Sequence, residues 1–395
     1  MEKVRYGIIG IGNMGSSHAK KFLKGEVENG VLTAICDLKP EKMKKVLDLE
    51  GGASLKTYTD YKEMLASGEI DAVIVAVPHY SHPQLTIDAL NAGIHAICEK
   101  PAGVYTKQVK EMNEVAKKSD KLFTMMFNQR TNCVYRKIRE MIRGGELGEI
   151  KRVNWIVTDW YRTQFYYDSG DWRATWRGEG GGVLFNQCPH QLDLLQWVTG
   201  MMPKKVHSFC HFGKWHDIEV EDDVTVYMEF ENGATGVFVT STGDTPGTNR
   251  LEIMGDKGKI VCQGDKTMKV FKFYKLATSE REFCKTSKEG FKNPEFEEID
   301  VETDGKNPQH VGILNNFSNA ILGLEPLFVE GVEGIRGVEL MDSMLLSTWL
   351  GKSVELPIDD DLYLEELNKR IATGRVKEGG DVVLDTEGSY GSKRS

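Results

Sequence analysis

The sequence predicts an α/β protein of two parts: a parallel sheet comes first, and an open, mainly antiparallel sheet covered by helices on one face follows. Over residues 1–125, apolar strand-like segments alternate with helical segments without hairpin signals, which is typical of parallel βαβ units. From Gly148 onward, short turns such as Glu231-Asn232-Gly233 join successive strand-like segments, which is typical of antiparallel neighbours. The chain has 395 residues, which is enough for two hydrophobic cores.

We therefore expect domains at residues 1–125 and 126–395, with a final helix near 334–350 and a polar tail over 358–395. The expected strands of the first domain are 4–9, 31–36, 70–77, 94–98 and 122–127, and its expected helices are 17–23, 41–49, 83–91 and 106–117. The expected strands of the second domain are 149–159, 205–212, 223–230, 235–242, 250–254, 259–262 and 268–274, with helices opening at Cys188-Pro189 and across 311–321. The run 70–77 is almost continuously apolar, as expected for a strand covered on both faces.

The composition is acidic, with a formal net charge of −9 and a pI near 5.6. Nucleic acids and anionic membranes attract basic surfaces, so we expect neither as a partner. No apolar run approaches the roughly 20 residues that span a bilayer, and the first residues carry no secretory signal pattern. The seven cysteines form no CxxC pair, which favours reduced thiols in a cytoplasmic protein. His207, His211 and His216 lack the spacing of a metal site, so we expect no metal.

A glycine-rich turn, Gly10-Ile11-Gly12-Asn13-Met14-Gly15, follows the first apolar segment and precedes a helical one. In this context the glycines allow a tight turn and a close approach of the backbone to a pyrophosphate, which then faces the helix N-terminus. Asp37 ends the second strand, where a carboxylate accepts hydrogen bonds from both ribose hydroxyls and repels a 2′-phosphate. We therefore expect a Rossmann dinucleotide-binding domain that takes NAD, with NADP the less favoured cofactor.

Polar groups follow two further strands of this expected sheet. Val77-Pro78-His79-Tyr80-Ser81-His82 follows one strand, and Glu99-Lys100-Pro101 follows the next. In open parallel sheets, ligands bind beyond the carboxyl ends of the strands. The residues expected to line the cofactor crevice there are Val77, Pro78, His82, Glu99 and Lys100. The alternative for His82 is a cap on the helix that follows it.

Lys100 is the candidate for chemistry at this edge of the sheet. A lysine at the end of a buried strand is costly unless its ammonium is paired or used. Beside a cationic oxidised nicotinamide the pKa of a lysine falls, and such a group exchanges a proton with a substrate hydroxyl. The alternative is a surface lysine beside a turn proline.

A second polar cluster is Gly180-Gly181-Gly182-Val183-Leu184-Phe185-Asn186-Gln187-Cys188-Pro189-His190-Gln191-Leu192-Asp193. Pro189 suits the first turn of a helix, which places His190 near the helix start with Asp193 on the same face. Three successive glycines suggest that the backbone passes close to something bulky. His190 is therefore a candidate catalytic residue, and the alternative is a structural histidine in a helix cap.

Residues 155–177 are rich in aromatic side chains, and three arginines are interleaved with them. Sugar rings stack their C–H faces on aromatics, while their hydroxyls take charged or amide partners. We expect Tyr167, Trp172 and Arg173 to bind the substrate, and a sugar acid or a phosphosugar fits the arginines as well. The alternative is packing under the sheet or in a subunit interface, where Tyr, Trp and Arg are also enriched.

Together these motifs resemble the glucose–fructose oxidoreductase, inositol dehydrogenase and MocA (Gfo/Idh/MocA) family. The resemblance rests on the glycine turn at 10–15, Glu99-Lys100-Pro101, Asn128-Gln129-Arg130, the glycines at 180–182, and the following His190 and Asp193. It implies a Rossmann domain followed by an open-sheet α/β domain that often serves oligomerisation. It also implies that Lys100 and His190 flank the reacting carbinol.

The resemblance further implies that Glu99 lies by the nicotinamide ribose and Asn128 by the nicotinamide, with Arg130 and Asp193 at the substrate. Many members carry an aspartate four residues before the histidine, where this chain has Asn186. An amide can hydrogen-bond a substrate hydroxyl but carries no charge. The proton role therefore falls on the lysine and the histidine, with Asn186 as a substrate-binding residue.

The activity that the resemblance implies is NAD-dependent hydride transfer between a nicotinamide and a secondary hydroxyl of a sugar, a glycoside or a cyclitol. The sequence around Asn186 resembles a branch of the family that contains glycoside 3-oxidoreductases. Inositol 2-dehydrogenase is an alternative activity. The same parts fit a redox-neutral enzyme with tightly bound NAD, either a glycosidase acting by oxidation and elimination or a sugar–sugar oxidoreductase. A non-catalytic sugar or NAD sensor is a further alternative. The exposed face of the second sheet predicts a homo-oligomer, whether dimer, tetramer or hexamer.

Overall fold

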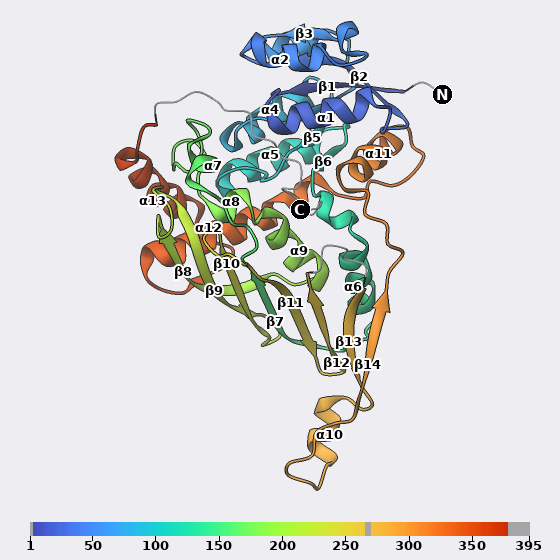
Figure 1. The fold of residues 1–395 in the computed structure, drawn as a ribbon, viewed down its shortest axis with the longest axis vertical. Coiled ribbons are helices and arrows are strands. Elements are labelled where there is room, and N and C mark those ends of the chain that lie inside the picture. The colour runs from blue at the N-terminus through green and yellow to red at the C-terminus, as the bar shows by residue number, and fades with distance from the viewer. Residues whose placement is uncertain (1–2, 265–269, 378–395) are drawn as a thin grey trace.

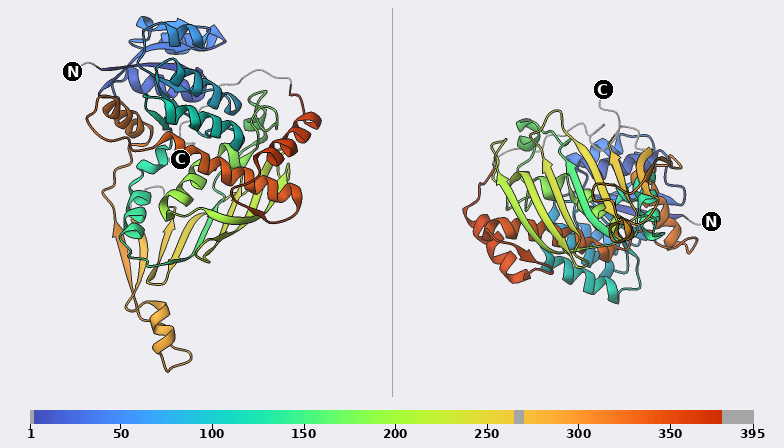
Figure 2. Two further views of the ribbon diagram at one scale, coloured as in Figure 1. Left: turned by 180° about the vertical axis from the view of Figure 1, so that it is seen from behind. Right: turned by 90° about the horizontal axis from the view of Figure 1, so that it is seen from below.

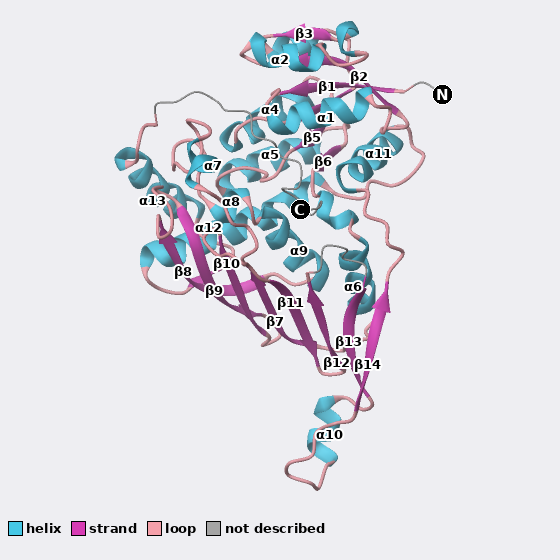
Figure 3. Ribbon diagram, viewed as in Figure 1, coloured by secondary structure: helices cyan, strands magenta, loops and turns pink. Residues whose placement is uncertain are grey.

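Two separate sheets organise the protein, as the sequence predicts. The structure is a computed structural model that describes residues 3–264 and 270–377. In Figure 1 the parallel sheet lies at one end of the molecule and the second sheet at the other, with helices between them. The secondary-structure colouring in Figure 3 makes the same separation visible.

The first sheet has six parallel strands in the order β3-β2-β1-β4-β5-β6. They are β1 (Val4–Ile9), β2 (Gly30–Cys36), β3 (Lys56–Tyr58), β4 (Ala72–Val75), β5 (His95–Cys98) and β6 (Phe123–Met125). The helices between them are α1 (Asn13–Leu23), α2 (Pro40–Leu47), α3 (Tyr61–Ala66), α4 (His82–Asn91) and α5 (Thr106–Lys118). All of β4 is buried, as expected for a central strand covered on both faces. The strand order reverses between β1 and β4, so their carboxyl ends open onto a ligand crevice.

The second sheet has nine strands in the order β14-β13-β12-β11-β7-β10-β9-β8-β15. They are β7 (Ile150–Val157), β8 (Pro203–Phe212), β9 (Glu221–Phe230), β10 (Thr235–Ser241), β11 (Asn249–Gly255), β12 (Gly258–Gln263), β13 (Val270–Leu276), β14 (Phe296–Glu302) and β15 (Val354–Glu355). Residues 268–269 of one expected strand lie outside the described residues. Within the described part of the chain, β7 and β10 pair in parallel and the other pairs are antiparallel.

Helices of the second half cover one face of this sheet, the face that points toward the first sheet. They include α6 (Cys133–Arg143), α7 (Gln164–Asp168), α8 (Val183–Asn186), α9 (Pro189–Thr199) and α12 (Gly334–Leu350). Every residue of α9 is buried, because this helix lies in the core between the two sheets. The bounds of α12 are those expected from the sequence. The view from below in Figure 2 looks onto the opposite face of the sheet, where the strands lie in front of the helices.

The polar tail expected over 358–395 is wrong in its first part, since a further helix, α13 (Asp360–Thr373), forms there. Asp359 caps this helix by accepting from two backbone N–H groups. Tyr363 and Leu367, one helical turn apart, are its buried residues. Two well-spaced apolar residues therefore suffice to dock a mostly charged helix. Residues 378–395 lie outside the described residues.

The sequence pattern also does not predict β14 or the short helix α10 (Glu280–Thr286) that precedes it. Four of the seven residues of β14 are acidic, so it has no strong apolar alternation. Part of its negative charge is paired with the neighbouring strand, because Lys272 of β13 lies 2.8 Å from both Glu298 and Asp300.

One helix of the second half belongs structurally with the first sheet. This helix, α11 (Gln309–Ile321), lies beside β2 and α1 in Figure 1. Tyr6 and Ser318 are joined by a 2.8 Å hydroxyl hydrogen bond, and Glu28 N donates to Asn315 at 2.8 Å. The start of α11 is thereby brought to the edge of the ligand crevice.

Among the described residues, no helix combines the length and the apolar character needed to cross a bilayer.

Candidate active site

The glycine turn after β1 has the shape that a dinucleotide pyrophosphate requires. Gly10 has φ +91°, and a Cβ there would lie 2.4 Å from the carbonyl oxygen of Ala76. A Cβ on Gly15 would lie 1.9 Å from the carbonyl oxygen of Gly10, so α1 packs directly on the turn. A Cβ on Gly12 would meet no atom within 4 Å, which leaves room for a ligand against the backbone. Gly12 is also the N-cap of α1 and provides no side-chain cap. The residues present therefore fit a pyrophosphate at this helix N-terminus.

Asn13 and Met14, the other residues predicted to bind the cofactor here, form the first turn of α1 and are half-buried.

Asp37 is held in place at the end of β2 by this same turn. Its Oδ2 accepts from Ile11 N at 2.7 Å and its Oδ1 accepts from Lys39 N at 2.9 Å. A carboxylate has about four acceptor positions, so two remain for ribose hydroxyls. The structure thus brings together the turn and the acid that were predicted separately.

The structure gives His82 a different contact from the one predicted. Its ring is buried, with Nδ1 2.6 Å from the carbonyl oxygen of Pro101 and Nε2 2.8 Å from that of Val77. It therefore connects the ends of β4 and β5 and is the first residue of α4, and its ring contacts these two carbonyl oxygens instead of capping the helix as the alternative had it. Val77 is half-buried and Pro78 is exposed.

Glu99, which directly follows β5, is buried against α1. His18 Nε2 donates to Glu99 Oε1 at 2.7 Å, and Lys100 N donates to Glu99 Oε2 at 3.2 Å. Burial raises the pKa of Glu99, but the hydrogen bond from His18, together with smaller contributions from the neighbouring charges, outweighs it and brings the pKa to about 2. Glu99 is therefore ionised. The sequence analysis missed His18, although it lies three residues beyond the glycine turn on the same helix.

Lys100 and His190 come from different domains and lie in one neighbourhood. Lys100 Nζ donates to the backbone oxygen of Asn186 at 2.9 Å, which ties it to the segment before α9. Its peptide bond to Pro101 is cis. His190, on the first turn of α9, is buried, and its pKa lies well below its usual value because of burial and the charge of Lys100. The imidazole is therefore neutral near pH 7.

A buried carboxylate that the sequence analysis missed, Glu179, stands next to these groups. It accepts hydrogen bonds from the side-chain amide of Asn186 and, at 2.6 Å, from Ala174 N. Its backbone oxygen accepts from His79 Nδ1 at 3.0 Å. No sequence pattern predicts a role for Glu179, because that role comes from contacts with residues elsewhere in the chain.

Asn128 is fully buried beside the start of α11. Its amide nitrogen donates to Gln309, which has a positive φ of +53°, and its Oδ1 accepts no hydrogen bond from the described residues. This leaves a buried acceptor on Asn128, as a contact to a nicotinamide carboxamide would require. His310, the next residue of α11, lies 5.5 Å from the ring of His18, and no sequence pattern places it there.

Arg130 and Asp193 face each other instead of an open site. The guanidinium donates to both carboxylate oxygens of Asp193, at 2.6 and 2.8 Å, and also pairs with Glu333. Both Arg130 and Asp193 are 1% exposed. A bidentate ion pair this deeply buried saturates both partners and connects the segment after β6 to α9, and the further pair with Glu333 reaches the residue directly before α12. The geometry therefore corrects the expectation that they bind the substrate.

Of the two neighbouring tyrosines in the aromatic stretch, Tyr166 lies at the site and the predicted Tyr167 does not. Tyr167 is 2% exposed and its hydroxyl bonds Thr242, so it belongs to the core. Its neighbour Tyr166 is half-buried, and its hydroxyl accepts from Arg173 at 3.0 Å and from Gln187 at 3.1 Å. The short helix α7 turns alternate residues to different sides, and the spacing alone does not fix which one faces in.

Trp172 and Arg173 do lie together near the predicted site. The guanidinium of Arg173 stacks 4.6 Å from the Trp172 ring centre, and Trp172 packs edge-on against His79 at 5.6 Å. His79 follows β4 at the crevice, so this contact joins the two domains.

Comparison with known proteins gives the relationship directly. A model described as "Oxidoreductase family, NAD-binding Rossmann fold" matches residues 4–127, and one described as "GFO/IDH/MocA C-terminal domain" matches residues 135–261. D-glucoside 3-dehydrogenase of Escherichia coli is 31% identical over 248 residues, covering 58% of this chain and 68% of that protein. The chain belongs to the Gfo/Idh/MocA family. It is an oxidoreductase whose first sheet is an NAD-binding Rossmann fold.

Other members of the family are similar over comparable or greater lengths. Myo-inositol 2-dehydrogenase of Thermotoga maritima is 26% identical over 65% of this chain and 74% of that protein. The WlbA dehydrogenase of Chromobacterium violaceum, crystallised with NADH and UDP-GlcNAcA, has a TM-score of 0.77 and 26% identity, covering 91% of this chain and 97% of that one. Gfo/Idh/MocA relatives of this chain therefore include sugar and cyclitol dehydrogenases acting on CH–OH groups.

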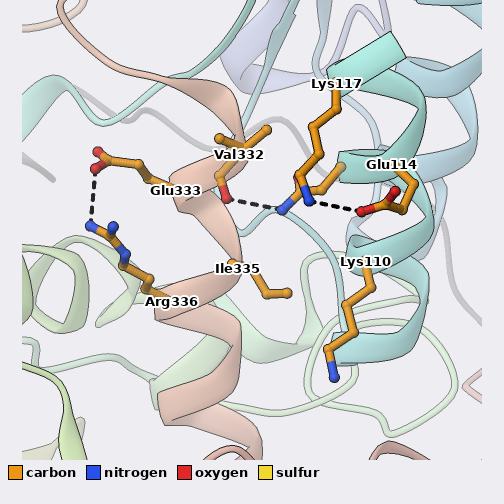
Figure 4. Close-up of a pocket in the computed structure, with 8 residues that line it drawn as sticks. Lys110, Glu114, Lys117, Val332, Glu333, Ile335 and Arg336 are labelled. Atoms are coloured by element: carbon orange, nitrogen blue, oxygen red, sulfur yellow. Dashed lines mark hydrogen bonds and ion pairs between the residues drawn. The ribbon is translucent and has the colours of Figure 1, made fainter.

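The structure also has a surface pocket lined mostly by charged side chains. Figure 4 shows it between α5 and the start of α12, lined by Lys110, Asn113, Glu114, Lys117, Val332, Glu333, Ile335 and Arg336. Its charges are largely paired within the pocket, as in Lys117–Glu114 at 2.8 Å and Arg336–Glu333 at 2.9 Å. No group of three or more His, Cys, Asp or Glu among the described residues has the arrangement of a metal site.

Proposed function

We propose that this chain oxidises a secondary hydroxyl of a sugar, glycoside or cyclitol, with Lys100 and His190 as the catalytic residues. The observation that carries the proposal is the 2.9 Å hydrogen bond from Lys100 Nζ, just beyond β5, to the backbone oxygen of Asn186, four residues before His190. The charge of Lys100, which adds to burial in lowering the pKa of His190, supports it as well. Glycosides oxidised at C3 are the narrower proposal, supported by the similarity to D-glucoside 3-dehydrogenase.

The residues that would hold NAD are the glycine turn at 10–15, Asp37, Glu99 and Asn128. When bound, the nicotinamide supplies the hydride acceptor. Glu99 is ionised and fixed by His18, so it would accept a hydrogen bond from a ribose hydroxyl without moving.

The proton of the substrate hydroxyl is assigned to Lys100. His190 is neutral and buried, and a second proton on its ring would meet the ammonium of Lys100. A neutral imidazole instead orients the hydroxyl through a hydrogen bond. Trp172 and Arg173 offer an apolar face and a donor for the rest of the sugar ring. Asn186 lies between Lys100 and Glu179 and would bind a neighbouring hydroxyl.

The experiment begins with the purified protein. Bound nicotinamide is first measured after denaturation, and the protein is then screened with monosaccharides, disaccharides, glycosides and inositols for NADH formation. We expect NADH with at least one glycoside and a loss of about a thousandfold in kcat for Lys100→Met with NAD binding retained.

Two other outcomes point to the alternatives. Copurifying NAD with turnover that needs no added NAD indicates a redox-neutral enzyme. Sugar binding without any turnover, unchanged in Lys100→Met, indicates a sensor and contradicts the proposal.

We also propose a homo-oligomer that buries the outer face of the second sheet. Large apolar side chains are exposed on its strands, namely Ile156, Phe209, Tyr227, Met254, Val270 and Phe296. A self-complementary contact between two copies would cover them. None of the seven cysteines, all of which lie in the described part of the chain, forms a disulfide bond, which supports a reducing compartment, and we propose the cytoplasm.

A further inference from the structure

Glu179 is a buried carboxylate whose two oxygens both accept hydrogen bonds. Ala174 N donates to Oε2 at 2.6 Å, and the side-chain amide of Asn186 donates to Oε1. Only 2% of the residue is exposed. Both contacts come from N–H groups, which is the arrangement that an ionised carboxylate takes. A buried anion of this kind needs a cation nearby.

Two cations lie near this carboxylate, Arg173 and Lys100. Burial raises the pKa of Glu179, and the charges of Arg173 and Lys100 act against that rise. The charge of Arg173 acts more strongly on Glu179 than that of Lys100, and Arg173 also stacks on Trp172 at 4.6 Å and donates to the hydroxyl of Tyr166 at 3.0 Å.

Asn186 connects the carboxylate to the ammonium. Its backbone oxygen accepts from Lys100 Nζ at 2.9 Å, while its side-chain amide donates to Glu179. One residue therefore contacts the ammonium with its main chain and the carboxylate with its side chain. A change at Glu179 reaches Lys100 both through this residue and through space.

We propose that Glu179 is a positioning residue for Lys100, with a negative charge held beside the ammonium by Asn186, whose main chain contacts Lys100 and whose side chain contacts Glu179. The inference rests on the proposed function, since it assigns the proton of the substrate hydroxyl to Lys100. It goes beyond that function because it names Glu179 as a partner of Lys100. Glu179 lies seven residues before Asn186, through whose amide it acts.

The loop that carries Glu179 is fixed from the cofactor side. His79 Nδ1 donates to the backbone oxygen of Glu179 at 3.0 Å, and the hydroxyl of Tyr80 donates to the backbone oxygen of Trp176 at 2.6 Å. Both donors follow β4, at the edge of the crevice that takes the nicotinamide. The separation between Glu179 and Lys100 is thus set by the Rossmann domain rather than by a mobile surface loop.

Other titratable groups also act on this centre. The charge of Lys100 contributes to the pKa shifts of His79, His82, Glu99, Glu179, Cys188, His190 and His310. Among them, Glu99 and Glu179 are the carboxylates. Glu99 is already paired with His18, so Glu179 is the carboxylate whose removal isolates the effect on Lys100.

The first test measures Lys100 without any substrate. The NAD-loaded protein is acetylated briefly with acetic anhydride across a pH series, and the labelling of Lys100 is quantified by peptide mass spectrometry. Only the neutral amine reacts, so the pH midpoint reports the titration of this residue. In Glu179→Gln we expect the midpoint to fall by about one pH unit, because the ammonium loses a stabilising negative charge.

A matched control, Glu219, contacts the same loop from the segment between β8 and β9. Glu219 accepts from Trp176 N at 2.7 Å and from Arg375 N at 2.6 Å, and these contacts do not involve Asn186, through which Glu179 meets Lys100. Glu219→Gln should leave the midpoint unchanged. A purely structural role for Glu179 would make the two variants alike.

A charge exchange provides the rescue. The double variant Glu179→Gln/Asn186→Asp keeps the hydrogen bond between the two positions with donor and acceptor exchanged, and it restores one negative charge. We expect the Lys100 midpoint to return to within about 0.3 unit of the wild-type value. The acidic limb of the kcat/KM–pH profile should shift in the same direction in each variant.

The two measurements separate the inference from the proposed function. A shifted labelling midpoint that the double variant restores supports the role of Glu179 even if no sugar is oxidised. A midpoint in Glu179→Gln equal to that of the wild type, with NAD binding intact, overturns the inference even if sugars are oxidised. A midpoint that shifts and is not restored by the double variant overturns it as well, because the charge at this place would not be the cause.

Discussion

His18 Nε2 lies 2.7 Å from Glu99 Oε1, and this buried hydrogen bond joins the helix after the glycine turn to the end of β5. The contact fixes the carboxylate next to Lys100 relative to the part of the site that holds the pyrophosphate. The two halves of the nucleotide site are therefore mechanically connected through a pair of side chains.

Replacing His18 should leave the Glu99 carboxylate buried without its donor. We expect His18→Leu to lower the free energy of unfolding by about 3 kcal/mol at pH 7, and His18→Leu/Glu99→Gln to lower it by less. The folded-state pKa of Glu99 is about 2 against an ordinary 4.5, so the stabilisation is complete above about pH 4.5 and is lost as the pH falls toward 2. Denaturant unfolding at pH 7 measures both variants. Equal losses in the single and the double variant would contradict a coupled pair.

Glu221 should make stability depend on pH in the opposite direction. Burial raises its pKa to about 8, although Gly182 N and Leu184 N donate to it at 2.8 and 3.0 Å. Because the folded state holds this proton more tightly than the unfolded state, stability falls as the pH rises from 4.5 to 8, by up to about 1.4 kcal/mol per unit. Glu221→Gln should remove that slope. Denaturant midpoints at pH 5.5, 6.5, 7.5 and 8.5 test this, and parallel slopes in the two proteins would disprove it.

Asp37 should decide between NAD and NADP. Asp37→Ser removes the ribose acceptor while the hydroxyl can still meet the N–H of Ile11, which Asp37 now engages at 2.7 Å. We expect NAD to bind about a hundredfold more weakly and NADP to bind more tightly than in the wild type. Isothermal titration with both nucleotides measures the two changes. Unaltered NAD affinity would place the ribose elsewhere.

The exposed sheet face should govern assembly. Phe209 of β8 is 58% exposed, and Phe209→Asp should reduce the mass found by sedimentation to that of a smaller species. Leu324, 51% exposed just beyond α11, is the matched control, and Leu324→Asp should leave the mass unchanged. Equal masses for the wild type and both variants would exclude this face as the interface.

Features carried by local pattern could be predicted from the sequence. The glycine turn, Asp37 and the strand-end Lys100 are local, because a parallel sheet delivers the carboxyl ends of its strands to one edge. The same logic placed His190 at a helix start, and the structure has α9 beginning at Pro189.

Features that depend on long-range contacts could not be predicted from the sequence. From the sequence alone, Glu179 is an acidic residue in a loop. Its role appears only from its contacts with Asn186 and His79. Asp193 shares a helix face with His190, as predicted, but Arg130 arrives from another element and takes both of its oxygens. A sequence pattern predicts which face of a helix a residue occupies, but it does not predict which residue lies opposite that face.

The central claim is that a hydride leaves a sugar carbon for a nicotinamide held beside Lys100. The most direct measurement uses methyl glucosides deuterated at C3 and myo-inositol deuterated at C2, with mass spectrometry of the nicotinamide after one turnover. Deuterium on the nicotinamide ring in the wild type, and none in Lys100→Met loaded with the same NAD, is the result expected. Deuterium that stays on every sugar, although the sugars and NAD are bound, would contradict the account.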